Sequence, residues 1–147
     1  MRGPGGNELG FSVATALRAQ ETASDLLGIA LEGAGEGWAR CSMVVRADML
    51  NGHGTAHGGM IFALADTAFA WACNSRNVKT LAQAASISFL SPARAGETLT
   101  AAAREESAEG RTGVYSVRVT GEDGRVVAVF QGLSRTAGGL AVEIENA

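Results

Sequence analysis

The chain has 147 residues, of which 46% are hydrophobic, and this is enough for one compact domain with a buried core. Its net charge of -3 is spread without acidic or basic blocks, so nucleic acid is not expected as a partner. No stretch approaches the roughly 20 consecutive apolar residues that cross a bilayer, and the first residues lack the apolar core of a signal peptide. We therefore expect a soluble, cytoplasmic protein without a membrane partner, with Cys41 and Cys73 as reduced, packed thiols.

The first part of the chain predicts a loose arm, a helix, a strand and a loop. Residues 1–10 are rich in glycine and are expected to be flexible. Residues 12–27, SVATALRAQETASDLL, repeat apolar positions at helical spacing and indicate a short amphipathic helix. Residues 38–45, WARCSMVV, are typical of a strand, and the glycine, asparagine and histidine residues between 51 and 59 indicate a loop.

The second part combines one long apolar helix with a run of strands. Apolar residues dominate from about residue 57 to residue 75 and predict the central helix. Four strands should follow: TLAQAASISFLSPA, ETLTAAAREESAE, TGVYSVRVTG and VVAVFQGLSRTA, with turn signals between them. We expect these strands to pair consecutively as an antiparallel meander. Residues 138–147 have little to pack against and are expected to be flexible.

These elements define a fold class. The long helix is the only predicted element able to cover the apolar face of the sheet. We therefore predict an α+β fold in which an antiparallel sheet wraps around one long central helix, with residues 1–147 forming a single domain. Because the helix is apolar on nearly every side, one sheet cannot bury all of it, and an oligomer is expected.

Asp66 is the single charge in the middle of the apolar helix. An ionised carboxylate in apolar surroundings is costly unless it is paired or hydrogen-bonded, and desolvation raises its pKa. One interpretation is structural: Asp66 faces a solvent-filled groove or caps a backbone group. The other is functional, with Asp66 as an acid-base group.

The residues HGG at positions 57–59 open the same helix. The first turn of a helix offers unpaired backbone N–H groups and a partial positive charge, and glycine lets a ligand approach the backbone closely. Such N–H groups can hold the oxyanion that forms when a carbonyl is attacked. An oxyanion donor together with a base indicates acyl hydrolysis.

Helix geometry restricts how these two groups can cooperate. Gly58 and Asp66 are eight residues apart, which corresponds to about 12 Å along one helix. A carbonyl bonded to the Gly58 N–H therefore lies out of reach of Asp66 in the same chain. If both groups act on one substrate, Asp66 must come from a second subunit, and a two-fold axis would then create two identical shared sites.

At this point the chain resembles a known family, the hotdog-fold thioesterases of the phenylacetic acid degradation (PaaI) type. The resemblance is carried by NGHGTAHGGMIFALADTAFAWACNS, ISFLSPARAGETLTA and GRTGVYSVRVTGEDGRVVAVFQGLSR, and so covers nearly all of the chain after residue 10. It implies hydrolysis of acyl-CoA thioesters, with aryl-acetyl-CoA compounds as the leading substrates and a tetramer built from two dimers. The family site falls on Asn51, His57, Gly58 and Asp66 with no departure in residue type or spacing.

The resemblance implies a role for each of these four residues. The Gly58 N–H binds the thioester oxygen, and Asp66 of the partner subunit activates water or attacks the carbonyl directly. Asn51 and His57 position the reacting groups, although both could instead only anchor the loop. His57 is not expected to be the base, because the positive end of the helix dipole disfavours a protonated imidazole.

Substrate contacts are less sharply defined by the sequence. The helical spacing of Phe62 and Phe69 favours core or dimer packing, although both could line an aryl pocket. Arg111, in the turn EGRTG, is the first choice to meet the CoA phosphates, and Arg94 is a further candidate together with Arg76 and Lys79. Arg111 could equally be a solvated cation in its turn.

No cofactor is expected apart from the coenzyme A of the substrate, and no metal. His53 and His57 are spaced like a metal-binding pair, but the loop spoils the required geometry and no third ligand follows. Two alternatives share the predicted scaffold: a hydratase or dehydratase that acts on acyl-CoA, and a non-catalytic module that binds acyl-CoA.

Overall fold

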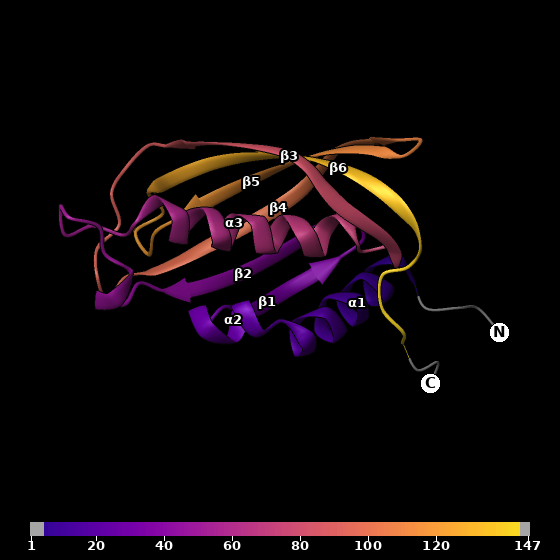
Figure 1. The fold of residues 1–147 in the computed structure, drawn as a ribbon, viewed down its shortest axis with the longest axis horizontal. Coiled ribbons are helices and arrows are strands. Elements are labelled where there is room, and N and C mark those ends of the chain that lie inside the picture. The colour runs from indigo at the N-terminus through magenta and orange to yellow at the C-terminus, as the bar shows by residue number, and fades with distance from the viewer. Residues whose placement is uncertain (1–4, 145–147) are drawn as a thin grey trace.

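The computed structural model describes residues 5–144 and consists of an antiparallel six-stranded sheet with one long helix across its face (Figure 1). The predicted α+β fold, an antiparallel sheet with one long central helix, is therefore confirmed. The elements in chain order are α1 (Gly6–Gln20), α2 (Thr22–Leu27), β1 (Ala30–Gly35), β2 (Trp38–Val44), a short 3-10 helix (Ala47–Met49), α3 (Gly58–Cys73), β3 (Val78–Phe89), β4 (Thr98–Glu109), β5 (Thr112–Thr120) and β6 (Val126–Leu140).

The strand order is β1-β2-β4-β5-β6-β3. The predicted meander of four consecutive strands is therefore wrong in one respect: β4, β5 and β6 pair consecutively, but β3 pairs with β6 at the edge of the sheet. The connection after β3 explains this order. It leads back to β2, where the Val45 N–H donates to Glu97 O at 2.9 Å and the Gly96 N–H donates to Val45 O at 2.7 Å, so β4 starts beside β2.

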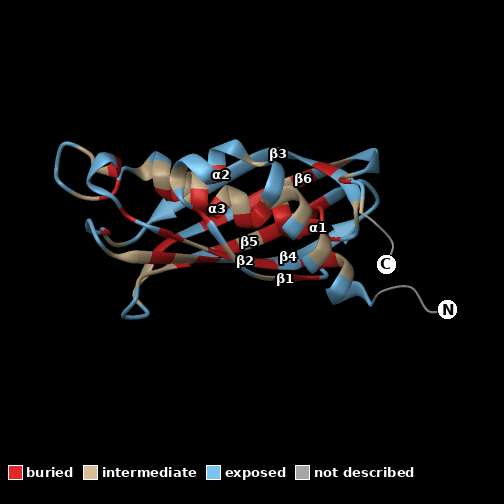
Figure 2. Cartoon of the chain, turned by 90° about the horizontal axis from the view of Figure 1, so that it is seen from below, coloured by how far each residue is buried: buried red, intermediate tan, exposed pale blue. Residues whose placement is uncertain are grey.

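The core lies between α3 and the concave face of the sheet, where Figure 2 shows a continuous band of buried residues. Phe69 of α3 packs against Tyr115 of β5 and Phe130 of β6, with ring centroids 5.6 and 5.8 Å away. Gly132 makes this approach feasible, because a Cβ at that position would lie 2.6 Å from the Phe69 ring. Alternating inward residues of the strands and one face of the helix therefore interlock, as their periodicities predict.

The N-terminal segment is more ordered than its composition indicates. Residues 6–10, predicted to be flexible, belong to α1, while residues 1–4 lie outside the described residues. Gly10 lets α1 pack directly on β1, because a Cβ there would lie 2.3 Å from the Gly35 oxygen. The predicted single helix over 12–27 is also wrong, since Glu21 has extended backbone angles and separates α1 from α2.

Glu21 connects the junction between α1 and α2 to the core. Its carboxylate accepts hydrogen bonds from the Trp71 indole nitrogen at 2.7 Å and from the Ser24 hydroxyl at 2.6 Å. Trp71 is fully buried in α3, so its N–H needs such a partner. The junction between the two N-terminal helices is therefore held by a partly buried polar contact that sequence periodicity does not reveal.

The C-terminal segment is also tied down. Residues 138–140 continue β6, and the backbone nitrogens of Ala141 and Val142 donate to the backbone and side-chain oxygens of Asn77 at 3.2 and 3.0 Å. Val142 is only 6% exposed. The predicted flexible tail is therefore wrong for residues 138–144, and residues 145–147 lie outside the described part of the chain.

The outer face of α3 is covered only in part. Phe62, Ala63, Asp66, Thr67 and Ala70 are all half-buried, whereas the residues facing the sheet are buried. Despite its apolar character, α3 is too short to cross a membrane, and no other helix within residues 5–144 qualifies either. The half-buried stripe is the surface that the sequence predicts to meet another chain.

Candidate active site

The loop before α3 is held by the side chain of Asn51. Its Oδ1 accepts hydrogen bonds from the backbone nitrogens of His53 and Thr55 at 2.9 and 3.2 Å, and its Nδ2 donates to the Thr55 hydroxyl at 3.0 Å. The Asn51 N–H also donates to Thr55 O at 2.8 Å. Asn51 therefore shapes the loop that leads into the helix, which is the structural role considered for it above.

His57 is the N-cap of α3. Its Nδ1 accepts a hydrogen bond from the Gly59 N–H at 3.0 Å, and its own backbone N–H donates to Met49 O at 2.8 Å. With the Nδ1 lone pair used in this way, the imidazole is bound to the helix start. Within residues 5–144, by contrast, no hydrogen bond uses the Gly58 N–H, which therefore remains an available donor.

Gly58 lies against Phe89, the last residue of β3. A Cβ at Gly58 would come within 2.9 Å of the Phe89 ring, so only glycine fits here without displacing that ring. A cavity of about 490 Å³ opens beside this contact. Its lining is mostly apolar and consists of Asn51, Thr55, Ala56, Gly58, Ile61, Phe89, Leu90, Ser91 and Pro92. We call it the helix-start cavity.

Asp66 does not line the helix-start cavity of its own chain. It lies two turns further along α3, on the half-buried outer face. Loss of contact with water raises the pKa of Asp66 above its ordinary value. A carboxylate with raised basicity is suited to proton transfer, and the structure keeps it apart from the Gly58 N–H within one chain, as the helix geometry predicts.

The two phenylalanines occupy different environments. Phe62 is half-buried on α3 and meets Phe130 edge to face, with ring centroids 5.3 Å apart. Phe69 is 0% exposed and packs within the core. Phe69 therefore has no surface to offer a ligand, which argues against its predicted place in a substrate pocket and favours the packing interpretation.

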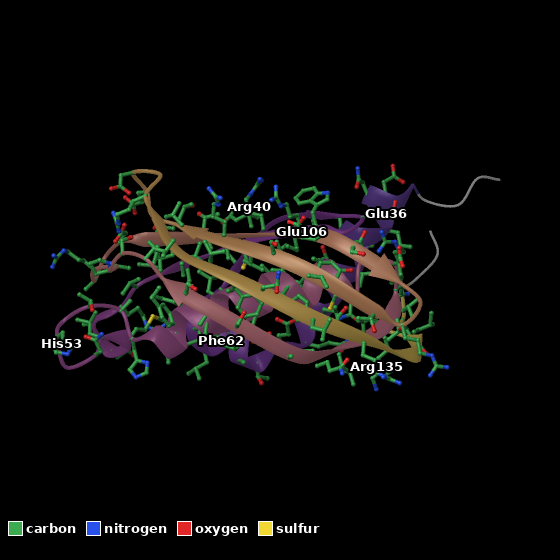
Figure 3. All side chains as sticks on the ribbon, turned by 90° about the horizontal axis from the view of Figure 1, so that it is seen from above. Glu36, Arg40, His53, Phe62, Glu106 and Arg135 are labelled. Carbon is green, nitrogen blue, oxygen red and sulfur yellow. The ribbon has the colours of Figure 1, made fainter. Side chains whose placement is uncertain are left out.

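The candidate cations lie at opposite ends of the sheet. Arg94 is exposed in the connection between β3 and β4, near the loop that holds Asn51, because Ala93 O accepts the Ala56 N–H at 2.8 Å. Arg111 is exposed in the turn between β4 and β5. Figure 3 shows the two ends, with His53 near the first and Arg135 near the second. One chain therefore does not bring Arg94 and Arg111 together.

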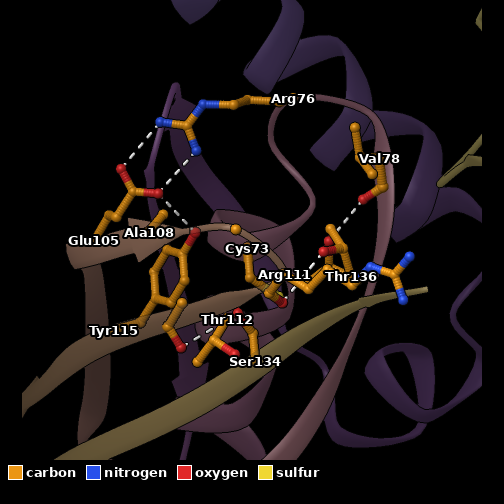
Figure 4. A pocket seen from close by; sticks show the side chains of 13 residues that line it. Cys73, Arg76, Val78, Glu105, Ala108, Arg111, Thr112, Tyr115, Ser134 and Thr136 are labelled. Carbon is orange, nitrogen blue, oxygen red and sulfur yellow. Dashed lines mark hydrogen bonds and ion pairs between the residues drawn. The ribbon is translucent and has the colours of Figure 1, made fainter. Parts of the chain in front are cut away.

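A second cavity, of about 370 Å³, lies at the C-terminal end of α3 (Figure 4). We call it the helix-end cavity. At its wall Glu105 accepts two hydrogen bonds from the Arg76 guanidinium, at 2.8 and 3.0 Å, and one from the Tyr115 hydroxyl at 2.9 Å. Its lining consists of Cys73, Arg76, Val78, Thr80, Glu105, Ala108, Gly110, Arg111, Thr112, Gly113, Tyr115, Ser134 and Thr136.

Sequence reasoning did not identify Glu105 or Tyr115 as site residues. The alternation in TGVYSVRV places Tyr115 on the inward face, but the closing of a cavity by Arg76 and Glu105 depends on two elements that are distant in sequence. Arg76, considered above for CoA phosphates, is already paired with Glu105 and with Glu36 at 3.1 Å. Burial raises the pKa of the Cys73 thiol to about 12, which agrees with an unreactive, packed thiol.

Known proteins are similar to this chain in sequence and in fold. A model of the thioesterase superfamily matches residues 53–128. The acyl-coenzyme A thioesterase PaaI of Escherichia coli (strain K12) is 44% identical over 126 residues, which are 86% of this chain and 90% of that protein. The solved structure of the E. coli PaaI protein, from the phenylacetic acid degradation operon, superposes with a TM-score of 0.90 at 41% identity, covering 92% of this chain and 98% of that one. The smu.793 protein of Streptococcus mutans UA159, solved bound to acetyl CoA, gives a TM-score of 0.72 at 26% identity, covering 75% and 89% of the two chains.

Fold, cavity and comparisons together define a hotdog-fold member of the thioesterase superfamily. Within it the chain belongs to the PaaI family of acyl-CoA thioesterases. The enzyme is therefore a thioester hydrolase, and the resemblance found in the sequence is confirmed. The site must accordingly supply an electrophilic contact for a thioester carbonyl and a means of activating water.

Proposed function

We propose that the enzyme hydrolyses aryl-acetyl-CoA thioesters in a site shared between two subunits. The observation that carries this proposal is that the two candidate reacting groups lie at different positions along α3. The free Gly58 N–H opens into an apolar cavity, while the half-buried Asp66 carboxylate with its raised pKa lies eight residues further on. Since these groups are about 12 Å apart along the helix axis, Asp66 of the partner subunit serves Gly58 of this one.

The free edge of β3 supports a dimer. Within residues 5–144 this strand is paired only with β6, and it exposes large apolar side chains: Val78 is 41%, Leu81 54% and Phe89 52% exposed. A long, apolar, unpaired edge favours association with another strand. The opposite edge of the sheet, β1, is covered by α1. We therefore place the two-fold axis of the dimer across β3.

Antiparallel pairing of two β3 strands brings opposite ends together. The start of one strand, at Val78, then lies beside the end of the other, at Phe89. Phe89 lines the helix-start cavity and Val78 lines the helix-end cavity. The dimer therefore joins the helix-start cavity of one subunit to the helix-end region of the other. Arg94, exposed near the helix-start cavity, is then placed to meet the CoA phosphates, whereas Arg111 lies at the helix-end cavity.

The chemistry follows from this arrangement. The thioester oxygen accepts the Gly58 N–H, which polarises the carbonyl and stabilises the oxyanion of the tetrahedral intermediate. Asp66 of the partner subunit takes a proton from the attacking water. Collapse of the intermediate breaks the C–S bond, and the same proton passes to the departing thiolate, which yields the acid and CoA. Asn51 and His57 keep the loop and helix start in place. The tetramer implied by the resemblance would pair two such dimers.

The acyl group is inferred from the cavity and from relatives. Ile61, Phe89, Leu90 and Pro92 make the helix-start cavity largely apolar. The E. coli relative comes from the phenylacetic acid degradation operon. An aryl-acetyl-CoA substrate suits a shared site with such a lining, because apolar and aromatic surface favours burial of an apolar substrate.

Thiol release from a panel of acyl-CoA compounds tests this function. We expect kcat/KM for phenylacetyl-CoA to exceed that for acetyl-CoA by at least about tenfold, the usual scale for filling an apolar pocket. Equal efficiency across the panel would contradict the aryl-acetyl preference. Consumption of an unsaturated acyl-CoA by addition of water, without thiol release, would instead indicate a hydratase.

A further inference from the structure

The helix-end cavity is not used by the chemistry described so far. It lies between the last turn of α3 and the inward faces of β4, β5 and β6, with β3 at its rim (Figure 4). Cys73 forms the helix side of this cavity and Thr136 of β6 contributes from the sheet side. Its volume of about 370 Å³ lies within the range of small-molecule pockets.

Two observations connect this cavity to Asp66. Cys73 follows Asp66 by seven residues, two helical turns, so both side chains point to the same side of α3 at an axial separation of about 10 Å. The negative charge of Asp66 also contributes to the raised pKa of the Cys73 thiol, after burial itself. A group that extends from a carbonyl beside Asp66 along the helix towards its C-terminal end therefore arrives at Cys73.

The far wall of the cavity is rigid. The Tyr115 ring is 2% exposed and packs on Phe69, while its hydroxyl is bound to Glu105. Glu105 is itself held by two hydrogen bonds from Arg76. Such a wall limits the length of any group that enters, because moving Tyr115 would break a charged network.

We propose that the helix-end cavity is the acyl pocket of the shared site, and that Cys73 and Thr136 set the size of the acyl group that is hydrolysed. This inference rests on the proposed function, and on the β3 dimer in particular. The thioester carbonyl lies between Gly58 of one subunit and Asp66 of the other, and the acyl group continues into the cavity beside that Asp66. Compact aryl-acetyl groups end at Tyr115, and the Arg76–Glu105 pair closes the pocket behind it.

The test fills the pocket from two sides. Cys73→Met adds bulk from the helix, and Thr136→Leu adds bulk from β6, where the residue is only half-buried and a larger side chain is more easily tolerated. For each variant the ratio of kcat/KM for phenylacetyl-CoA to that for acetyl-CoA is measured. We expect each substitution to lower this ratio by about tenfold or more, because the larger acyl group loses its space.

Matched controls separate pocket filling from general damage. Thr120→Leu makes the same change on β5 at a half-buried position that lines neither cavity, and should leave the ratio as it is in the unchanged protein. Cys73→Ala removes bulk and should favour the bulkier indole-3-acetyl-CoA over phenylacetyl-CoA. Because Cys73→Ala and Thr136→Leu place less demand on packing than Cys73→Met, they decide the matter if that variant fails to fold.

The outcomes distinguish the two proposals. If the unchanged enzyme releases no thiol from any aryl-acetyl-CoA, the proposed substrate class is wrong, and this inference fails with it. If it hydrolyses both probes but the folded variants keep the ratio within about twofold, the pocket assignment is wrong while the proposed function stands. A fall in the ratio for the filled variants, with Thr120→Leu unaffected, supports the assignment.

Discussion

Burial of Asp66 disfavours its charged form and at the same time makes its carboxylate more basic. Its raised pKa comes from burial, without an opposing cation, and a more basic carboxylate is a better proton acceptor in its ionised form. Gly58 works in the opposite way: it contributes only a backbone group, and its missing side chain leaves room for Phe89. In the proposed mechanism Asp66 therefore contributes a base, and Gly58 contributes a backbone N–H dipole.

Asp66→Asn keeps the shape of the side chain and removes its basicity. We expect kcat to fall by about a hundredfold or more with little change in KM, because the lost interaction acts in the transition state. In the unchanged enzyme kcat/KM should rise with pH through the pKa of Asp66, since only the ionised form accepts a proton. This acid limb should lie above the ordinary aspartate range, and the variant should lack it. A variant with near-normal turnover would reassign Asp66 to a structural role.

Among the elements, α3 was the most predictable from sequence and β1 the least. Sixteen consecutive helical residues carry a strong apolar signal, and both the helix and the carboxylate within it lie where the sequence predicts them. The segment of β1, ALEGAG, is short and contains two glycines, so local preference gives no strand signal and the pairing with β2 decides its structure.

The position of β3 shows a different limit of prediction from the sequence. Its alternating residues predict a strand, but they do not specify a neighbour, and the choice of β6 over β4 depends on where the following connection crosses. The same limit applies to the site. Asn51, His57, Gly58 and Asp66 are close in sequence, and the family resemblance identifies them as a set. The Arg76–Glu105–Tyr115 wall, in contrast, is assembled from the turn after α3, from β4 and from β5 only after folding.

The contact between Glu21 and Trp71 joins the N-terminal helices to α3. Glu21→Ala leaves the Trp71 N–H buried without its partner, so we expect the free energy of unfolding to fall by about 1–3 kcal/mol. Denaturant unfolding followed by tryptophan fluorescence measures this change. Glu8→Ala, at an exposed position in the same helix pair, is a suitable control. An equal effect of both substitutions would mean that the hydrogen bond to the indole does not contribute to the free energy of unfolding.

At the scale of the whole molecule, shared sites predict complementation. Asp66→Asn retains the oxyanion donor, and Gly58→Pro, which lacks the backbone N–H, retains the base. Each variant alone should be inactive. Refolded together in equal amounts, half of the dimers are mixed and contain one intact site, so about a quarter of the original activity should return. Mixed dimers that form but remain inactive would exclude the shared site, provided that Gly58→Pro is shown to fold.

The β3 edge is tested by placing a charge on it. Leu81→Lys changes a residue that is 54% exposed in the single chain, so the fold should persist. The dimer should dissociate, because the new charge would have to be buried between the two β3 strands. Sedimentation and thiol release should report a monomer without activity. Val129→Lys, at an exposed position on β6, one strand in from that edge, should stay active and oligomeric. A fully active monomer carrying Leu81→Lys would contradict a dimer interface at the β3 edge.

The free edge of β3 also has a kinetic consequence. If a catalytic centre exists only while two chains are together, the number of centres follows an association equilibrium. Well below the dissociation constant of the dimer, the number of centres grows with the square of the chain concentration, so halving the amount of chain quarters the rate. A substrate that contacts both subunits binds only the dimer and shifts the equilibrium towards it, so the substrate itself raises the amount of active enzyme.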